Sequence, residues 1–363
     1  MSKEYTLEEL FDLQMGKTPS RNNPEYWNSA DYKWISIGDL TKCGKYICET
    51  KEYLSDIAVS ESGISLIPAN TVVMSFKLSI GKTAITTVPM YSNEAIMSFR
   101  DRHSVDLLPD YIYYMFSGRD WDIGTNKAVM GKTLNKATLS KIKIRIHPIE
   151  EQKLIISVLD KVAAIIDARN RELQDLDDLI KARFVEMFGD AKSNPYGFEK
   201  KPLKETCTVI TGNTPPRSVP EYYGDTIEWV KTDNIVAGQL YPSQALEYLS
   251  DEGVKVGRTV NNGAILMACI AGSVASIGRV CITDRKVAFN QQINAIVPKD
   301  YDSLFLHTML QLSKEYLVEE VNMALKGILS KSKLESKEFI VPALNQQKEF
   351  AAFVAQVDKS KVV

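Results

Sequence analysis

The fold of this 363-residue chain is decided by residues 151–188, EQKLIISVLDKVAAIIDARNRELQDLDDLIKARFVEMF. The stretch contains neither glycine nor proline, the two residues that most disfavour a helix interior. Apolar side chains recur at steps of three or four, with one step of seven, at Ile155, Leu159, Val162, Ile166, Leu173, Leu176, Ile180, Phe184 and Met187. This spacing predicts one long helix with a single apolar stripe, about 55 Å long, that ends at Gly189 and must pack on another helix.

The second helix is expected at the end of the chain. After Gln347 the sequence KEFAAFVAQVDKSKVV places Phe350, Val354 and Val357 at steps of four and three, so the same stripe begins again. Only 16 residues follow Gln347, whereas the first helix extends 36 residues beyond Gln152. We therefore expect part of the longer stripe to lack a partner within this chain, because the second helix is either naturally short or truncated.

Two copies of one unit precede the two helices. The motif Gly-x-Thr-Pro occurs at residue 16 and again at 212, Pro-Glu-Tyr-aromatic at 24 and again at 220, and Tyr-Leu-Ser-Asp at 53 and again at 248. A Pro…Gln junction leads into each helix, at residues 148–152 and 342–347. A duplicated domain is the expected source of such a repeat.

Each copy is predicted to mix helices and strands. Apolar runs at residues 71–74 and 264–267 follow turn residues and predict buried strands, residues 109–116 and 303–310 predict helices, and residues 143–146 and 338–341 predict closing strands. The predicted fold class is α+β: two duplicated mixed α/β domains joined by long antiparallel, coiled-coil-like helices with pseudo-twofold symmetry. The predicted boundaries are 1–150 for the first domain, 151–189 for the central helix, 190–345 for the second domain and 346–363 for the C-terminal helix.

Composition limits the kind of protein. The chain has 44 Lys and Arg against 46 Asp and Glu, and the excess of acid lies in the central helix. This balance excludes an independent polycationic DNA binder. No apolar run approaches the roughly 20 residues of a membrane span, and the start is acidic, so we expect a cytoplasmic protein. Five cysteines without a Cys-x-x-Cys pair predict reduced thiols, and three scattered histidines predict no metal site.

Catalytic motifs are not found. Gly-Lys-Thr occurs at residues 16, 81 and 131, but each lacks the glycine five residues earlier that a phosphate-binding loop requires. There is no Asn/Asp-Pro-Pro-aromatic tetrapeptide of an adenine methyltransferase, no carboxylate cluster of a nuclease and no arguable Ser/His/Asp set. We conclude that the chain is not an enzyme by itself.

Polar and basic loops suggest DNA recognition instead. Residues 123–149 carry six basic side chains and no acidic one, a composition typical of phosphate contacts, and the second copy repeats it in diluted form. Arg and Asn in the Gly-x-Thr-Pro loops have the donors and acceptors that read guanine and adenine. The candidate DNA contacts are Lys17, Ser20, Arg21, Lys77, Ser79, Lys127, Lys132, Asn135, Lys136, Asn213, Arg217, Ser273, Lys326, Lys331 and Lys333. Candidate helix- and subunit-packing residues are Ile155, Leu159, Val162, Ile166, Leu173, Leu176, Ile180, Phe350, Val354 and Val357.

In the duplicated order of these motifs around a central helix, the chain resembles the specificity subunits of type I restriction-modification systems over essentially its whole length. The resemblance implies two target recognition domains, each reading one half of a bipartite, interrupted double-stranded DNA site, with the helices setting the gap. It implies a non-catalytic subunit on which two modification subunits and the restriction subunits assemble. S-adenosylmethionine, ATP and magnesium then belong to those partners and none to this chain.

A second hypothesis remains open from the sequence. In this alternative, the chain is an adaptor that joins two protein-binding modules through a coiled coil, without binding DNA. Steep dependence of DNA affinity on salt favours the DNA reader, and a flat dependence favours the adaptor.

Overall fold

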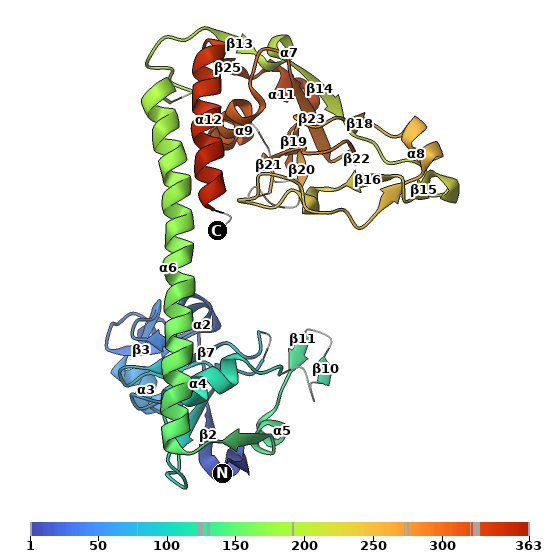
Figure 1. The fold of residues 1–363 in the computed structure, drawn as a ribbon. Coiled ribbons are helices and arrows are strands. Elements are labelled where there is room, and N and C mark those ends of the chain that lie inside the picture. Colours follow the sequence, from blue (N-terminus) through green and yellow to red (C-terminus); the bar gives the residue numbers. More distant parts are fainter. Residues whose placement is uncertain are drawn as a thin grey trace. The chain divides into compact units, whose positions relative to one another are not determined.

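The computed structural model describes residues 2–77, 79–121, 126–128, 131–190, 192–271, 273, 276–319, 321 and 327–361, with only the backbone for 126–128 and 131–133. The chain divides into two compact units, Met1–Ala168 and Arg169–Val363. The long helix α6 (Ile149–Phe188) contributes its first half to the first unit and its second half to the second unit (Figure 1). No described helix combines the length and the apolar character needed to cross a membrane.

The first unit is built on a five-stranded sheet and a three-stranded sheet. Its elements before α6 are β1 (Lys3–Thr6), α1 (Leu7–Leu10), β2 (Phe11–Met15), η1 (Pro24–Tyr26), β3 (Tyr32–Ile35), α2 (Ile37–Lys42), β4 (Tyr46–Ile47), β5 (Glu52–Leu54), α3 (Asp56–Ser62), β6 (Val72–Ser75), β7 (Thr83–Thr86), β8 (Tyr91–Ser92), β9 (Ile96–Asp101), α4 (Pro109–Ser117), β10 (Asn126–Ala128), β11 (Gly131–Thr133), α5 (Lys136–Ser140) and β12 (Lys143–Ile146). The larger sheet has the order β2-β9-β6-β7-β4, the smaller one β5-β3-β8, and the pairs β1-β12 and β10-β11 complete the unit.

The second unit repeats this plan. After α6 come β13 (Lys200–Pro202), α7 (Leu203–Thr206), β14 (Cys207–Thr211), η2 (Pro220–Tyr222), β15 (Tyr223–Gly224), β16 (Ile227–Val230), η3 (Thr232–Asn234), β17 (Tyr248–Leu249), α8 (Asp251–Val256), β18 (Thr259–Val260), β19 (Ile265–Ala268), β20 (Ile270–Ala271), β21 (Val280–Ile282), β22 (Val287–Phe289), β23 (Ile293–Pro298), α9 (Ser303–Leu312), α10 (Lys314–Val318), β24 (Gly327–Ile328), α11 (Lys331–Ser336), β25 (Glu338–Ile340) and α12 (Leu344–Ser360). Its main sheets have the orders β14-β23-β19-β21 and β15-β17-β16-β22-β18, beside the pairs β13-β25 and β20-β24.

The sequence repeat corresponds to repeated structure. In the first unit β3 runs parallel to β8, with Trp34 opposite Tyr91, and in the second β16 runs parallel to β22, with Trp229 opposite Ala288. The repeated Tyr-Leu-Ser-Asp motif ends a strand and starts a helix in both units, because the serine caps the helix N-terminus. Each serine hydroxyl accepts a bond from the backbone N–H three residues later.

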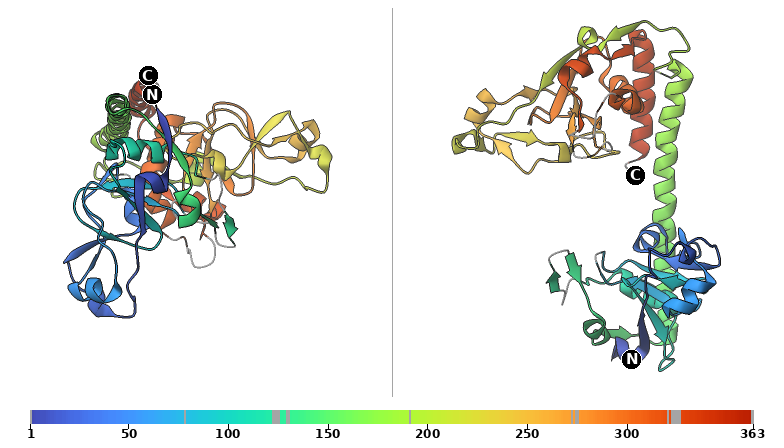
Figure 2. Two further views of the ribbon diagram at one scale, coloured as in Figure 1. Left: turned by 90° about the horizontal axis from the view of Figure 1, so that it is seen from below. Right: turned by 180° about the vertical axis from the view of Figure 1, so that it is seen from behind.

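The second half of α6 packs on α12. Phe184 and Phe350 are buried, with their ring centroids 5.5 Å apart, and Val354 and Val357 extend the same contact region. Arg169 near the start of this half bonds the carbonyl of Ser360, whereas Arg183 near its end meets Glu349, so the two helices are antiparallel. Figures 1 and 2 show α12 beside this part of α6. The predicted antiparallel helix pair is therefore present in the second unit.

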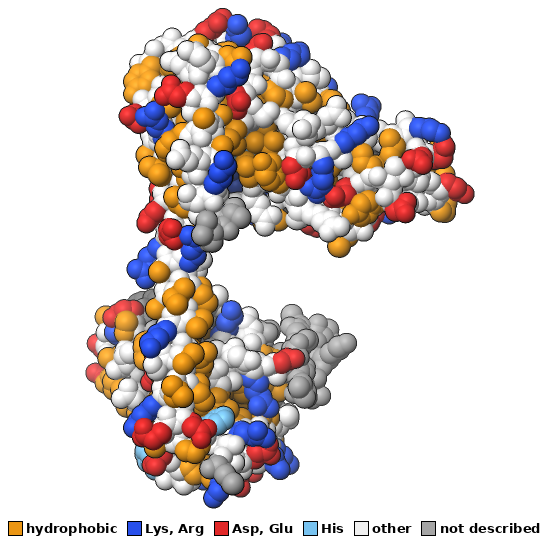
Figure 3. All heavy atoms as spheres, viewed as in Figure 1, with side chains coloured by type: hydrophobic (Ala, Val, Ile, Leu, Met, Phe, Trp, Pro, Cys, Tyr) orange, Lys and Arg blue, Asp and Glu red, His pale blue; other side chains and the backbone are white. Residues whose placement is uncertain are grey.

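The first half of α6 differs in its surroundings. Ile155 and Ile156 pack partly against the first unit, but Leu154, Val158, Val162, Ile165 and Ile166 have exposed fractions of 46–67%. We call these last five residues the exposed stripe. Apolar side chains gather along this part of the helix in the space-filling view (Figure 3). Val162 and Ile166, predicted to pack, are 46% and 54% exposed.

A buried glutamine fixes each unit to the helix that closes it. The side chain of Gln152 in α6 accepts from the N–H of Leu108 (3.0 Å) and donates to the carbonyls of Asp106 (2.9 Å) and His147 (2.8 Å). Gln347 in α12 makes the same three kinds of bond in the second unit. Both side chains are fully buried.

Candidate nucleic-acid interface

The Gly-x-Thr-Pro loops follow strands β2 and β14 and are held tightly against their units. A Cβ atom on Gly16 or Gly212 would collide with backbone carbonyl oxygens of a neighbouring segment. The N–H of Lys17 donates to the carbonyl of Ser92 (2.8 Å), and that of Asn213 donates to Phe289 (3.2 Å). Glycine is therefore required in both motifs because the backbone approaches so closely.

A buried tryptophan supports each loop from below. The indole N–H of Trp34 donates to the carbonyl of Lys17 (3.1 Å), and that of Trp229 donates to the carbonyl of Asn213 (3.2 Å). Both rings are almost fully buried. These tryptophans therefore anchor the two loops.

Each loop presents an arginine in the same setting. The guanidinium carbon of Arg21 lies 3.7 Å from the ring centroid of Trp27 and 4.9 Å from that of Trp34, and the group forms a two-bond ion pair with Glu52. We call this arrangement the first arginine stack. The side chain of Arg21 remains 47% exposed, so the stack holds the guanidinium in place and leaves part of it accessible.

The second unit contains an equivalent second arginine stack. Arg217 lies 4.3 Å from the ring centroid of Tyr223 and 5.2 Å from that of Trp229, and it pairs with Glu247. The side chain of Arg217 is 56% exposed. Lys231 also binds Glu247. Its hydrogen bond contributes most to holding the pKa of the Glu247 carboxyl below the usual value, and the hydrogen bond from Arg217 lowers this pKa further.

A polar contact beside each stack differs between the units. The hydroxyl of Thr18 donates to Glu94 in the first unit, whereas the hydroxyl of Thr214 donates to Gln291 in the second. The bond from Thr18 lowers the pKa of Glu94, and the nearby cations Lys77 and Arg21 lower it further. The structure thus places two predicted residues, Arg21 and Lys77, near one carboxylate.

Two predicted asparagines make local structural bonds. The side chain of Asn213 donates to the carbonyl of Val256 (2.8 Å) and accepts from the N–H of Arg258 (2.8 Å). Asn135 caps α5 by accepting from the N–H of Thr138 (2.7 Å). Both amides are engaged in holding loops, and base contact by either remains a prediction.

The other predicted residues lie at several places on the two units. In the first unit, the ammonium group of Lys17 donates to the carbonyl of Ser62, the carbonyl of Ser20 accepts from the indole of Trp27, and the carbonyl of Ser79 accepts from the hydroxyl of Ser75. Lys77 lies over the ring of Phe76, and Lys136 borders a hollow with Glu8 and Asp12. In the second unit, the hydroxyl of Ser273 contacts that of Ser276, Lys331 pairs with Glu335, and the backbone N–H of Lys333 donates to the hydroxyl of Ser330. The side chains of Lys127 and Lys132, and the whole of Lys326, lie outside the described residues.

Sequence reasoning missed the glutamates of the arginine stacks. Glu52 and Glu247 lie 31 and 30 residues after the arginines that they bind. A signal was present, because both glutamates directly precede the repeated Tyr-Leu-Ser-Asp motif. Among the described residues no group of three or more His, Cys, Asp or Glu side chains is placed to hold a metal ion.

Comparison with known proteins gives a consistent family match. A family model described as the type I restriction modification DNA specificity domain matches residues 2–177 and 195–362. The chain is 23% identical to the type I restriction enzyme MjaIX specificity subunit of Methanocaldococcus jannaschii, over 93% of this chain and 82% of the relative. It is 30% identical to the EcoR124I/EcoR124II specificity subunit of Escherichia coli, over 43% of this chain and 39% of that relative.

Solved structures support the fold. The crystal structure of a type I restriction-modification S subunit from M. genitalium matches with a TM-score of 0.55 at 12% identity, covering 99% of this chain and 90% of that one. A chain from a structure titled for complex assembly and conformational transition of the type I R-M system matches with a TM-score of 0.57 at 14% identity, covering 99% and 91%. At these identities the match concerns the fold alone, and it agrees with the predicted two-domain α+β architecture.

Proposed function

The chain belongs to the type I restriction modification DNA specificity family, and from this premise we propose that each unit reads one half of a bipartite, interrupted DNA site while the helices set the gap. The chain itself performs no catalysis in this proposal. It selects the sequence on which partner subunits act, in the cytoplasm. Methyl transfer with S-adenosylmethionine, and ATP- and magnesium-dependent steps, belong to those partners.

The observation that carries the proposal is the pair of equivalent arginine stacks. An arginine guanidinium can donate two parallel hydrogen bonds to the O6 and N7 atoms of guanine in the major groove. Stacking on aromatic rings restricts the side chain before DNA arrives, which reduces the entropy lost on binding. Repetition of the stack in both units, within loops that share the Gly-x-Thr-Pro and Pro-Glu-Tyr motifs, supports one reader in each unit.

The exposed stripe supports the assembly part of the proposal. Five large apolar side chains on one helix are a typical protein-interaction surface. We place one of two modification subunits on this stripe, and the restriction subunits join through the modification subunits. A partner helix laid along Val158, Val162 and Ile165 would remove their apolar surface from water.

The main test is the methylated motif of cells that express the full chain with its modification subunits. Arg21→Ala should relax or change one half of the motif and Arg217→Ala the other, because each loss costs about 1–3 kcal/mol of discrimination at one base pair. Arg119→Ala is the matched control, since Arg119 also lies over a tryptophan in the first unit but outside the loop. If Arg21→Ala alters both halves, or neither, the assignment of one half-site to each unit is wrong.

A salt titration separates DNA reading from the adaptor hypothesis. For the assembled complex, the logarithm of DNA affinity should fall linearly with the logarithm of salt concentration, with a slope set by the number of phosphate contacts. Replacing Lys17 or Lys77 by Met should reduce that slope by about one each. A flat response in the unaltered complex would favour the adaptor.

A further inference from the structure

The turn before strand β9 and the turn before strand β23 are equivalent in the two units. Residues 93–96 read Asn-Glu-Ala-Ile, and residues 290–293 read Asn-Gln-Gln-Ile. In each turn the asparagine side chain accepts from the backbone N–H two residues later, at 3.0 Å in the first unit and 3.1 Å in the second. The backbone N–H of the isoleucine donates to the carbonyl of the asparagine, at 3.2 and 3.1 Å. The second residue of the turn, Glu94 or Gln291, therefore occupies the same place in its unit.

The side chain at this place is bound by the loop that carries the stacked arginine. Thr18 donates to Glu94, and Thr214 donates to Gln291. Each threonine stands three residues before the arginine of its stack, in the Gly-x-Thr-Pro loop. Both Glu94 and Gln291 are exposed. Each unit thus presents an exposed polar side chain, held through one oxygen atom, next to its proposed guanine contact.

The two side chains differ in the hydrogen bonds that they can make. An ionised carboxylate only accepts hydrogen bonds, whereas a carboxamide both donates and accepts them. The hydrogen bond from Thr18 lowers the pKa of Glu94, so this carboxyl group is ionised near pH 7. The carboxamide of Gln291 is neutral. The exchange between the units therefore changes the hydrogen-bond pattern and the charge but hardly the shape.

The neighbouring residue differs in the same sense. The residue before Lys77 and the residue before Ile270 each donate a backbone N–H to the carbonyl of the residue two after the turn asparagine, at 3.0 and 2.8 Å. Lys77 therefore corresponds to Ile270. Lys77 lies near enough to Glu94 to help lower its pKa. A cation accompanies the carboxylate and an apolar residue accompanies the carboxamide, so the first unit offsets the repulsion between its carboxylate and DNA phosphates.

The base edges in the major groove distinguish these two kinds of side chain. Cytosine presents a donor, its N4 amino group, which suits a carboxylate. Guanine presents two acceptors and thymine an acceptor beside a methyl group, and neither pattern suits a carboxylate. Adenine presents a donor at N6 beside an acceptor at N7, which together suit a carboxamide.

We propose that Glu94 and Gln291 select the base at one equivalent position of the two half-sites. Glu94 accepts from the N4 amino group of a cytosine in one half-site, and Gln291 accepts from N6 and donates to N7 of an adenine in the other. Because a threonine already holds each side chain, little conformational freedom is lost on binding. This selection rests on the proposed function, DNA reading by each unit, and gives two units with equivalent arginine stacks different half-sites.

The test exchanges the two side chains in cells that express the full chain with its modification subunits. Glu94→Gln should replace cytosine by adenine at one position in one half of the methylated motif. Gln291→Glu should replace adenine by cytosine at one position in the other half. The preference at each position should change by about 10- to 100-fold, the range of one good contact between a side chain and a base.

Two outcomes would overturn this selection without affecting the proposed function. The first is a motif that changes with Arg21→Ala but not with Glu94→Gln, because DNA reading by the first unit is then intact. The second is the absence of any G·C pair from the half-site that Arg21→Ala alters, because Glu94 then has no cytosine to bind. If neither Arg21→Ala nor Glu94→Gln changes the motif, the proposed function fails as well.

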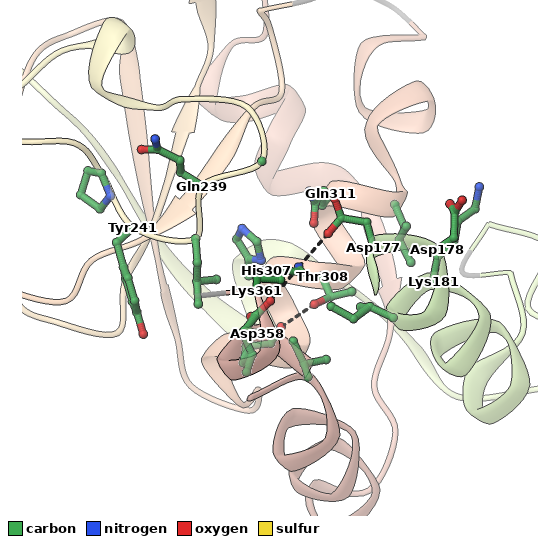
Figure 4. Close-up of a pocket in the computed structure, with 17 residues that line it drawn as sticks. Asp177, Asp178, Lys181, Gln239, Tyr241, His307, Thr308, Gln311, Asp358 and Lys361 are labelled. Atoms are coloured by element: carbon green, nitrogen blue, oxygen red, sulfur yellow. Dashed lines mark hydrogen bonds and ion pairs between the residues drawn. The ribbon is translucent and has the colours of Figure 1, made fainter. Parts of the chain in front are cut away.

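Each exchange has a matched control in its own unit. Glu49→Gln removes the same charge from an exposed carboxylate that Lys33 binds at 2.7 Å. Gln239→Glu adds the same charge at an exposed residue of the second unit, beside a cavity of about 630 Å³ whose described lining residues do not include Gln291 (Figure 4). Both controls should leave the motif unchanged. Equal changes in the controls would show that net charge, and not the place of Glu94 or Gln291, alters the motif.

Chemically altered DNA tests the contact itself, independently of methylation. In a duplex that carries the motif, the selected cytosine is replaced by 2-pyrimidinone, which lacks the 4-amino group. The replacement should weaken binding of the unaltered complex about tenfold, because the carboxylate loses its donor. It should have little effect on the Glu94→Gln complex, whereas the Glu49→Gln complex should respond like the unaltered one. An equal loss in the unaltered and Glu94→Gln complexes would reflect weaker base pairing alone and refute the contact.

Discussion

The two halves of α6 have the same apolar spacing but different surroundings. The second half is covered by α12 and contributes Ile180, Phe184 and Phe188 to a buried core, whereas the first half exposes Val162 and Ile166. Helical periodicity determines that a stripe exists and where it points. Which other element covers the stripe is not determined by the spacing, so equivalent patterns have different surroundings: one half packs in the core of its own unit and the other stays exposed.

The largest expected effect distinguishes the buried half from the exposed one. Phe184→Ala should lower the free energy of unfolding of the second unit by about 3–5 kcal/mol, because it empties a site between three other phenylalanine rings. Denaturant titration, followed by hydrogen exchange to resolve the two units, measures the loss. Val162→Ala on the exposed half is the control, and an equal loss there would contradict the difference between the halves.

A pH titration should affect the second unit more than the first. The folded pKa of His307 is about 4 and its unfolded value about 6.5, so the unfolded chain binds an extra proton between these limits. Stability should therefore fall as pH falls from about 6.5 to 4, by at most about 3 kcal/mol. His307→Asn is the control, because it keeps Asp358 and Lys361, the charged groups that act on His307, and it should show a flatter pH dependence. Identical curves for both chains would contradict the shifted pKa.

Replacement of Lys45, whose ammonium group lies 2.6 Å from Asp110 and 2.7 Å from Asp160 of α6, tests how the first half of α6 is held. Lys45→Met should cost the first unit about 1 kcal/mol, since Asp160 is half exposed and its ion pair is screened by solvent. The pKa of Asp160, which Lys45 lowers most, should rise in the variant, and NMR titration of its carboxyl measures the change. Lys161→Met, at the position directly after Asp160 on the same helix, is the control. A pKa of Asp160 that stays low in Lys45→Met would show that the ion pair does not hold this helix.

The smallest expected effect concerns the exposed stripe. Ile165→Ser should change the free energy of unfolding of the isolated chain by less than about 0.5 kcal/mol, because Ile165 is 67% exposed. The same substitution should weaken co-purification with modification subunits. Leu179→Ser, an exposed position on the second half of α6, is the matched control and should leave assembly intact. Normal assembly with Ile165→Ser would remove the stripe from the proposed docking surface.

Much of the fold could be predicted from local sequence. The long helix was expected over residues 151–188 and is observed over Ile149–Phe188, and the closing strand expected at residues 143–146 is β12. These elements are predictable because periodicity, the absence of glycine and proline, and flanking turns act over short distances. The short segment after Gln347 predicted that part of the stripe lacks a partner in this chain, but periodicity alone does not distinguish Val162 from Phe184, which follow the same steps.

The candidate site was predictable only in part. The repeated loops identified Arg21 and Arg217, but their partners Glu52 and Glu247 lie about 30 residues away and depend on strand pairing. Asn135 and Asn213 have side chains suited to base reading, yet their bonds close a helix cap and a loop. Residue type predicts which chemistry is available at a position, whereas folding decides how much of it is left for a ligand.

The glutamine anchors have an evolutionary consequence. Gln152 and Gln347 bind only main-chain groups, and two of the three residues that supply them differ. Leu108 and His147 in one unit correspond to Asp302 and Pro342 in the other, whereas the third is an aspartate in both. After an ancestral duplication, side chains around each anchor were therefore able to diverge without compensating changes at the joint. Such a joint also tolerates recombination, because an incoming domain of foreign sequence brings the same backbone groups to the same glutamine.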